Sequence, residues 1–387
     1  MSNVLSNVTS KLPDVGTTIF AVMSAMAQKN EADNLAQGFP EFDPDPWLRA
    51  RVAYYIEHGA NQYAPMPGTE QLRQAIQKKT ADFYDVEVDI DSEITVTSGA
   101  TEAIFAAIQS VTKPGDEVII FDPAYDCYDP AVRLSGGKAV HLPLDSHDFA
   151  IQWDLLEQAF NQNTRLIIIN SPHNPTGAVL SADDLERLAR LIKDSQCLLI
   201  SDEVYEHIIF DGQEHASVLR HPELKERSFV VSSFGKTYHM TGWKIGYCIA
   251  PQRLTVELRK LHQFLTFSTS TPMQLAIADM IAEKPDYPRE LAKMYQSKRD
   301  CFVNALANSR FRVIPCHGTY FQLLDYSAIS NLDDMAFTRW LTEQHRVATI
   351  PISPFCQPAN PDYRFIRCCF AKSEETLVSV AERLALL

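Results

Sequence analysis

The spacing of hydrophobic residues changes near residue 94. Before that point, apolar residues recur at helical intervals, which predicts helices over 17–28, over 47–58 and from Thr69 onward. After it, short Val/Ile-rich runs alternate with helical stretches. The runs are continuous rather than alternating in polarity, as expected for strands covered on both faces of a mostly parallel sheet. Seven runs have this character: 94–96, 117–121, 139–142, 166–170, 198–201, 229–232 and 245–249.

The last third of the chain has a different order of elements. A long helical region over 255–266 and 271–284 leads into it. Beyond this region, helices and strands no longer alternate one for one, which predicts a smaller α+β unit. We expect helices at 289–306, 333–343 and 374–386, with strands at 311–314, 320–324, 347–350 and 365–370.

Composition limits the classes of function. The chain has 387 residues, of which 45% are hydrophobic and 22% charged, and its net charge is −14. An acidic chain without a basic run does not predict a nucleic-acid surface. No apolar run approaches the roughly 18 residues of a membrane span. The eight cysteines are scattered without a C-x-x-C pair, so we predict reduced thiols in the cytoplasm and no metal site.

Polar and small residues follow several predicted strands. In a parallel α/β sheet, the carboxyl ends of the strands gather the ligand-binding loops. Ala100 and Thr101 lie where a strand passes into a helix, so backbone N–H groups there could bind a phosphate. Tyr125 could form a flat platform for a ring. A plain helix start and a packed loop tyrosine are the alternative interpretations of these two sites.

Two further loops carry polar groups. Asn174 lies in a loop fixed by two prolines and a glycine, and it offers a rigidly held amide. Asp202 ends a buried strand and needs a cationic or N–H partner, with Tyr205 three residues later. A simple turn and an N-cap carboxylate are the alternatives. We interpret His173 as structural.

The stretch from Ser232 to Gly246 holds two lysines among small residues. Lys236 follows a short apolar strand, and burial there would lower its pKa and make it a nucleophilic amine. Ser233 and Lys244 suit an anionic ligand. The alternative is a pair of ordinary surface lysines. Pyridoxal phosphate (PLP) would use all of these groups, since it has a phosphate, an aromatic ring with a nitrogen and a hydroxyl, and an aldehyde.

The order of these motifs resembles the class I/II aminotransferases of PLP fold type I. The resemblance is greatest to the branch that includes kynurenine/glutamine aminotransferases and bacterial methionine aminotransferases. It covers about residues 13 to 387 and rests on the motifs N-L-A-Q-G-F-P-E-F, N-Q-Y-A-P-M-P-G, S-P-H-N-P-T-G, S-D-E-V-Y, S-S-F-G-K-T-Y-H-M-T-G-W-K-I-G-Y and F-I-R-C-C-F.

The resemblance implies a seven-stranded, mostly parallel sheet between helices, with a smaller C-terminal α+β domain. Residues 1–45 would form an arm and a helix that join the small domain. Residues 46–275 would form the large PLP-binding domain, and residues 276–387 the small domain. A homodimer with active sites shared across its interface is also implied.

The resemblance also implies a role for each cofactor residue. Lys236 corresponds to the Schiff-base lysine and general base, and Asp202 to the partner of the pyridine nitrogen. Asn174 and Tyr205 correspond to the pair that bonds the ring hydroxyl, and Tyr125 to the stacking aromatic. The phosphate would be held by Ala100, Thr101, Ser233 and Lys244, with Ala100 standing where relatives often have glycine.

Substrate residues follow from the same resemblance. Arg367 corresponds to the clamp for the substrate α-carboxylate, helped by Asn174 and the backbone of Gly38. Phe20 corresponds to an aromatic near the substrate side chain, and Tyr63 to a tyrosine that reaches the phosphate of the neighbouring subunit. Further pocket candidates are Phe39, Phe267 and Ser268, and 265–270 contains no arginine for a second carboxylate.

We therefore expect transamination between neutral apolar or aromatic amino acids and a 2-oxo acid. Methionine is the first expected donor, then phenylalanine, tyrosine, tryptophan, histidine or kynurenine. A PLP-dependent cysteine-conjugate or cystathionine β-lyase would share every cofactor residue and remains the alternative. A PLP-binding regulator would add a helix-turn-helix region, for which the first 15 or so residues are too few. A nucleotide-dependent enzyme is disfavoured by the missing Gly-rich fingerprints.

Overall fold

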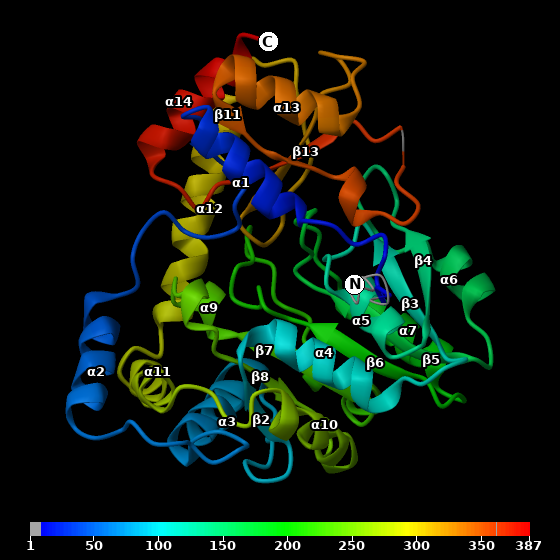
Figure 1. The fold of residues 1–387 in the computed structure, drawn as a ribbon, viewed down its shortest axis with the longest axis vertical. Helices are drawn as coiled ribbons and strands as arrows, with labels where there is room; N and C mark the ends of the chain where they lie inside the picture. The colour runs from blue at the N-terminus through cyan, green and yellow to red at the C-terminus, as the bar shows by residue number, and fades with distance from the viewer. Residues whose placement is uncertain (1–8, 361) are drawn as a thin grey trace, which may run out of the picture.

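The central sheet has seven strands in the order β2–β8–β7–β6–β5–β3–β4 (Figure 1). The computed structural model describes residues 9–360 and 362–387. All strands of this sheet run parallel except β8, which pairs antiparallel with both β2 and β7. The prediction of a mostly parallel sheet is therefore confirmed. The strands are β2 (Ile94–Thr97), β3 (Glu117–Asp122), β4 (Lys138–Pro143), β5 (Thr164–Asn170), β6 (Leu198–Asp202), β7 (Ser228–Ser233) and β8 (Gly246–Ile249).

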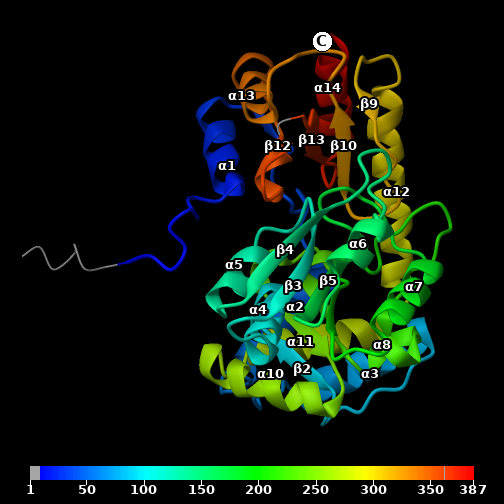
Figure 2. The same ribbon diagram turned by 90° about the vertical axis from the view of Figure 1, so that its right-hand side faces the viewer.

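Helices cover both faces of this sheet (Figure 2). Successive strand residues point to opposite faces, so Val118 and Ile120 join one core and Ile119 joins the other. This double coverage explains why the strands are apolar along their whole length. One face carries α4 (Gly99–Val111), α5 (Tyr128–Leu134) and α10 (Gln252–Leu265), and the other carries α3 (Glu70–Tyr84), α7 (Ala182–Ile192) and α11 (Thr271–Glu283).

A second, antiparallel sheet lies in the C-terminal part of the chain, in the order β12–β13–β10–β9. The single strand predicted over 347–350 is wrong, because this segment changes partner. β11 (Val347–Ala348) pairs with β1 (Asp33–Asn34), whereas β12 (Ile350–Pro351) pairs with β13. The other elements are β9 (Arg312–Val313), β10 (Phe321–Asp325), β13 (Phe365–Cys369), α12 (Tyr287–Ala305), α13 (Asp334–His345) and α14 (Glu374–Ala385).

The N-terminal segment lies against this second unit. α1 (Ile19–Lys29) begins at Thr18, whose Oγ1 accepts a hydrogen bond from the N–H of Ala21 at 3.3 Å. α1 packs against β11 and α13, and Figure 1 shows it in dark blue beside them. Residues 1–8 of the expected arm lie outside the described residues.

The two helical stretches expected at 255–266 and 271–284 are present as α10 and α11. α10 ends at Leu265, and Phe267 adopts a left-handed backbone conformation with φ of 67° before α11 begins. A side chain with that φ cannot continue a right-handed helix. The remaining helices are α2 (Pro46–Glu57), α6 (Trp153–Ala159), α8 (Pro222–Lys225) and the short α9 (Phe234–Thr237). Within the described ranges, no helix is long and apolar enough to cross a membrane.

Candidate active site

A cavity of about 190 Å³ lies at the carboxyl ends of β2, β5, β6 and β7. Parallel strands bring their following loops together at this edge, so residues far apart in sequence share one wall. Nine of the ten residues predicted to contact the cofactor line the cavity, and only Tyr63 does not. The nine are Ala100, Thr101, Tyr125, Asn174, Asp202, Tyr205, Ser233, Lys236 and Lys244.

One end of the cavity can hold an anion. The first turn of α4 presents backbone N–H groups there, and helix N-termini favour negative charge. Gly99 has φ of +76°, and a Cβ at this position would lie 3.2 Å from Nζ of Lys244, so glycine permits the close approach. No carboxylate of the described chain lies within ion-pairing distance of Lys244. Its charge is therefore available to a ligand.

The same cavity also carries a buried carboxylate. Asp202 ends β6, and its Oδ2 accepts a hydrogen bond from the Tyr128 hydroxyl at 2.6 Å, while Oδ1 accepts one from the N–H of Val204 at 3.3 Å. No lysine, arginine or histidine among the described residues pairs with it. Burial raises the pKa of Asp202 to about 6. The site therefore favours a ligand that brings a positive charge or an N–H donor to Asp202.

Lys236 lines this cavity as well. Its Nζ donates hydrogen bonds to the carbonyl oxygen of Gly38 at 3.2 Å and to the hydroxyl of Tyr320 at 3.0 Å. Burial, together with the nearby charges of Arg367 and Lys244, lowers the pKa of Lys236 to about 8. A lysine with this pKa can act as a nucleophile and as a proton carrier near neutral pH.

A second cavity, of about 320 Å³, adjoins the first at Lys236, Asn174 and Tyr205. Arg367 of β13 lies in its wall and is 1% exposed. Its Nη1 donates to Oδ1 of Asn174 at 2.8 Å, and its Nη2 donates to the carbonyl oxygen of Ala36 at 3.1 Å. Its Nε has no hydrogen-bond acceptor in the described chain. Predicted substrate residues Phe20, Gly38 and Phe39 line this cavity as well.

Tyr63 lies outside both cavities. Its side chain is 84% exposed, and its ring packs edge-on against Phe267 with centroids 5.6 Å apart. Tyr63 and Ser268 line a shallow surface hollow instead. The predicted pocket residues Tyr63, Phe267 and Ser268 therefore do not line the second cavity of their own chain, in which Arg367 lies.

Tyr128, Tyr320 and Thr241 are among the residues at the site that the sequence did not predict. Tyr128 is three positions after Tyr125, a helical spacing that could have indicated a second tyrosine at the site. Tyr320 precedes a strand with no local signal, because only the packing of the second unit brings its hydroxyl to Lys236. Thr241 lines both cavities from the turn that follows α9.

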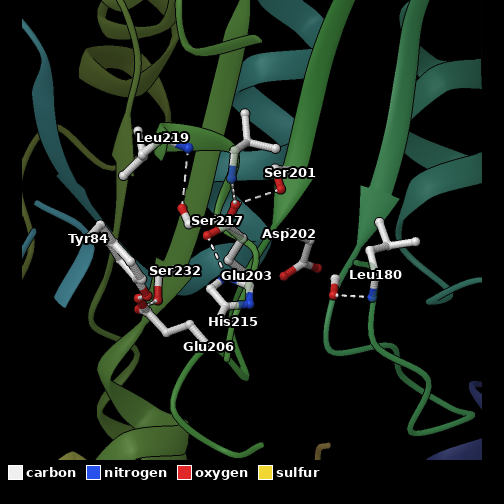
Figure 3. A network of polar contacts seen from close by, with 12 residues as sticks. Tyr84, Leu180, Ser201, Asp202, Glu203, Glu206, His215, Ser217, Leu219 and Ser232 are labelled. Carbon is white, nitrogen blue, oxygen red and sulfur yellow. Dashed lines mark hydrogen bonds and ion pairs between the residues drawn. The ribbon is translucent and has the colours of Figure 1, made fainter. Parts of the chain in front are cut away.

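A separate buried network lies beside the site. Glu206 is 6% exposed and accepts hydrogen bonds from Tyr84, Ser232 and Tyr247, while Lys79 forms an ion pair with it at 2.7 Å. Figure 3 shows the Tyr84, Ser232 and Glu206 side chains in contact, with Asp202 apart from them at the end of its strand. Every oxygen of Glu206 therefore has a partner within the chain.

Comparisons with known proteins identify relatives over nearly the whole chain. The model of the family "aminotransferase class I and II" matches residues 32–384. The methionine aminotransferase of Escherichia coli is 53% identical and covers 97% of each chain. A kynurenine–oxoglutarate transaminase of Dictyostelium discoideum is 35% identical over 95% of this chain and 94% of its own. A solved Escherichia coli structure with an identified methionine aminotransferase function has a TM-score of 0.95 at 52% identity, covering 98% of this chain and 99% of its own.

Enzymes of this family catalyse amino acid transamination with pyridoxal phosphate. The residues present fit that cofactor, because the cavity combines an unpaired cation, a buried carboxylate without a cationic partner and an amine of lowered pKa. The match to the family model, the sequence identity to relatives and the similarity to solved structures all extend over most of the chain and indicate the same family. From them it follows that this protein is a member of the class I and II aminotransferases.

Proposed function

We propose that the protein transfers the amino group of neutral apolar and aromatic L-amino acids, with methionine preferred, to a 2-oxo acid. The observation that carries the proposal is the adjoining pair of cavities, in which Asn174 contacts Arg367 and lies in the same wall as Lys236. The amine of Lys236 and the guanidinium of Arg367, placed in this way, suit the two functional groups of an α-amino acid.

The residues of the first cavity would hold the cofactor. Lys236 would bind it covalently through Nζ, and Asp202 would face its ring nitrogen. Tyr125 would lie against the ring, and Asn174 and Tyr205 would bond its hydroxyl. When bound, pyridoxal phosphate supplies an electron sink for the pair of electrons left at the substrate Cα. The phosphate would be bound by Ala100, Thr101, Ser233 and Lys244.

The residues of the second cavity would orient the substrate. Nε and Nη of Arg367 can donate two parallel hydrogen bonds to the α-carboxylate, a geometry that fixes the direction of the Cα–H bond. Lys236, once its Nζ is released, would remove the proton from the substrate Cα, hold it on Nζ and later donate it, so that the same group acts first as base and then as acid. Its pKa of about 8 suits both directions of transfer.

The lining of the second cavity supports an apolar side chain in the substrate. Phe20, Phe39 and Phe321 contribute rings to it, and Arg367 is the only arginine among the described lining residues. Without a second arginine, a dicarboxylic donor would leave its distal carboxylate unpaired, which is costly in an apolar wall. The similarity to a methionine aminotransferase agrees with this choice.

We also propose a homodimer in which Tyr63 reaches the phosphate of the partner subunit, because its exposed ring lies away from the site of its own chain. Within the subunit, we propose domains at 1–45 with 276–387 and at 46–275, a division supported by the contact of α1 with α13. We propose a cytoplasmic location, since all eight cysteines are unpaired.

The two lysines provide the test of the mechanism. Lys236→Arg keeps the positive charge but cannot form the covalent link, so we expect transamination of methionine to fall by about 10³-fold or more. Lys244→Ala should mainly weaken cofactor retention, and excess cofactor should restore much of the rate. The opposite pattern for the two variants would overturn the assignment.

Substrate choice is tested by comparing donors at equal concentration. Methionine should be converted to its 2-oxo acid faster than aspartate, and cystathionine should release little pyruvate. Faster turnover of aspartate would contradict the apolar pocket. Pyruvate release that exceeds methionine transamination would instead indicate a β-lyase.

A further inference from the structure

A third cavity, of about 280 Å³, lies on the other side of the wall of the cofactor site. Asn170 lines both cavities, and the ring of Tyr128 lines the third one while its hydroxyl bonds to Asp202. The walls are mainly apolar and include the buried side chains of Leu144, Phe149 and Ile168. The cavity is larger than the cofactor site and uses none of its charged residues.

We propose that this third cavity is an accessory binding site for a small apolar amine, and that its occupancy is transmitted to the active site. The size of the cavity and its apolar walls suit a single aromatic ring or a short alkyl group. Leu180 lines the cavity, and its backbone N–H donates a hydrogen bond to the hydroxyl of Ser171 (Figure 3). Binding of the amine does not depend on the proposed function, whereas its effect on the transamination rate rests on that function.

The charges at the cavity favour a cation over a carboxylate. Asp148 and Asp184 line it where it meets solvent, and no lysine or arginine of the described chain does. Within the described residues, each carboxylate keeps one oxygen without a hydrogen bond, because Asp148 accepts only through Oδ1 and Asp184 only through Oδ2. Burial lowers the pKa of His173 to about 4, so this lining residue is neutral. Amino acids and 2-oxo acids would bring their carboxylates against two negative charges.

Two contacts connect this cavity to the reacting groups. Tyr128 is shared between the cavity wall and Asp202. The segment that begins with Pro315 and His317 at the cavity continues to Tyr320, whose hydroxyl accepts a hydrogen bond from Lys236. An occupant that shifts either segment would change the surroundings of Asp202 or of Lys236. Such coupling is reciprocal, so substrate should also change the affinity for the amine.

The probe for this site is N,N-dimethyl-2-phenylethylamine, because a tertiary amine cannot condense with the cofactor aldehyde. Its binding to the holoenzyme would be measured by calorimetry, with and without methionine, and its effect on the rate of methionine transamination would be measured in parallel. We expect binding that excess methionine does not abolish, and a change in kcat/KM at saturating probe. If methionine is not converted at all, the proposed function fails, while the binding measurement still stands.

Two variants locate the bound probe. Ala150→Phe places a ring in the lining at the mouth and should weaken binding by about tenfold or more. Asp148→Asn should weaken it by about two- to fivefold, as expected for an exposed charge pair. Asp154→Asn is the matched control, since this exposed aspartate of α6 lies outside the lining and makes the same change in net charge.

The proposal predicts weaker binding in the first two variants and unchanged binding in the control. It is overturned if the probe does not bind, or if it is displaced by methionine in direct competition. It is equally overturned if Ala150→Phe binds the probe like the wild type, or if saturating probe leaves kcat/KM unchanged.

Discussion

Asp202 and Glu206 are both buried carboxylates, only four residues apart, yet their surroundings differ. Asp202 has one hydroxyl and one N–H as partners, and burial raises its pKa to about 6. Burial also disfavours the ionised form of Glu206, but Lys79 and the hydrogen bonds around Glu206 outweigh it and hold its pKa well below its usual range. Within the described residues, Glu206 has a cationic partner as well as hydrogen-bond donors, whereas Asp202 has hydrogen-bond donors but no cationic partner.

This difference reverses the effect of each group on stability in the cofactor-free protein. The pKa of Asp202 is higher in the folded state than its ordinary value of 3.8, so its burial costs stability progressively from about pH 4 to pH 6 and fully above that. The pKa of Glu206 is lower in the folded state, so Glu206 stabilises the protein above its ordinary pKa of 4.5. That stabilisation is lost as the pH falls. The pH dependence of stability therefore distinguishes the two carboxylates, because ionised Asp202 lowers stability and ionised Glu206 raises it.

Among changes to the two carboxylates and their partners, Asp202→Asn is expected to have the largest effect, a loss of activity. An amide cannot stabilise a protonated ring nitrogen, so we expect kcat/KM for methionine to fall by about 10²–10³-fold. The cofactor-free variant should be no less stable than the wild type at pH 7, because the cost of burying a charge is removed. Urea unfolding and steady-state kinetics would measure both. Near-normal activity would contradict the proposed role of Asp202.

Glu206→Gln should have the opposite profile. Lys79 would remain buried without a counter-charge, which costs about 3–5 kcal/mol of unfolding free energy. Folded protein should keep its activity within a few-fold, since Glu206 lines neither the cofactor cavity nor the substrate cavity. The double variant Lys79→Met/Glu206→Gln should recover stability. Unchanged stability in the single variant would show that the ion pair is not structural.

The smallest effect is expected for Tyr128→Phe. Loss of the hydroxyl removes a hydrogen bond that favours the ionised form of Asp202, so its pKa should rise above about 6. Cofactor binding by the cofactor-free protein should then weaken near pH 6, with its pH midpoint moved upward by about one unit. Absorbance titrations over pH would measure the shift. Tyr84→Phe, which alters the Glu206 network instead, should leave the midpoint unchanged.

Local chemistry allowed most residues of the first cavity to be predicted from the sequence. Asp202, Lys236 and Asn174 each follow an apolar strand, and parallel strands deliver such residues to one edge of a sheet. Tyr320 could not be predicted, because its hydroxyl reaches Lys236 from the segment just before β10, 84 positions further along the chain. The same holds for the Glu206 network, in which Lys79 comes from α3 and Ser232 from β7.

The sequence by itself determined the family, the alternation of strands and helices, and the residues that meet at the strand ends. These features depend on periodicity and on motifs, which are local properties of a chain. Only the tertiary structure decided that Glu206, and not Asp202, pairs with a lysine. It also decided that Tyr63 lies outside the cavities of its own chain and that a third cavity adjoins Tyr128. Such features depend on packing between distant segments, because burial and partners set the charge state of each group.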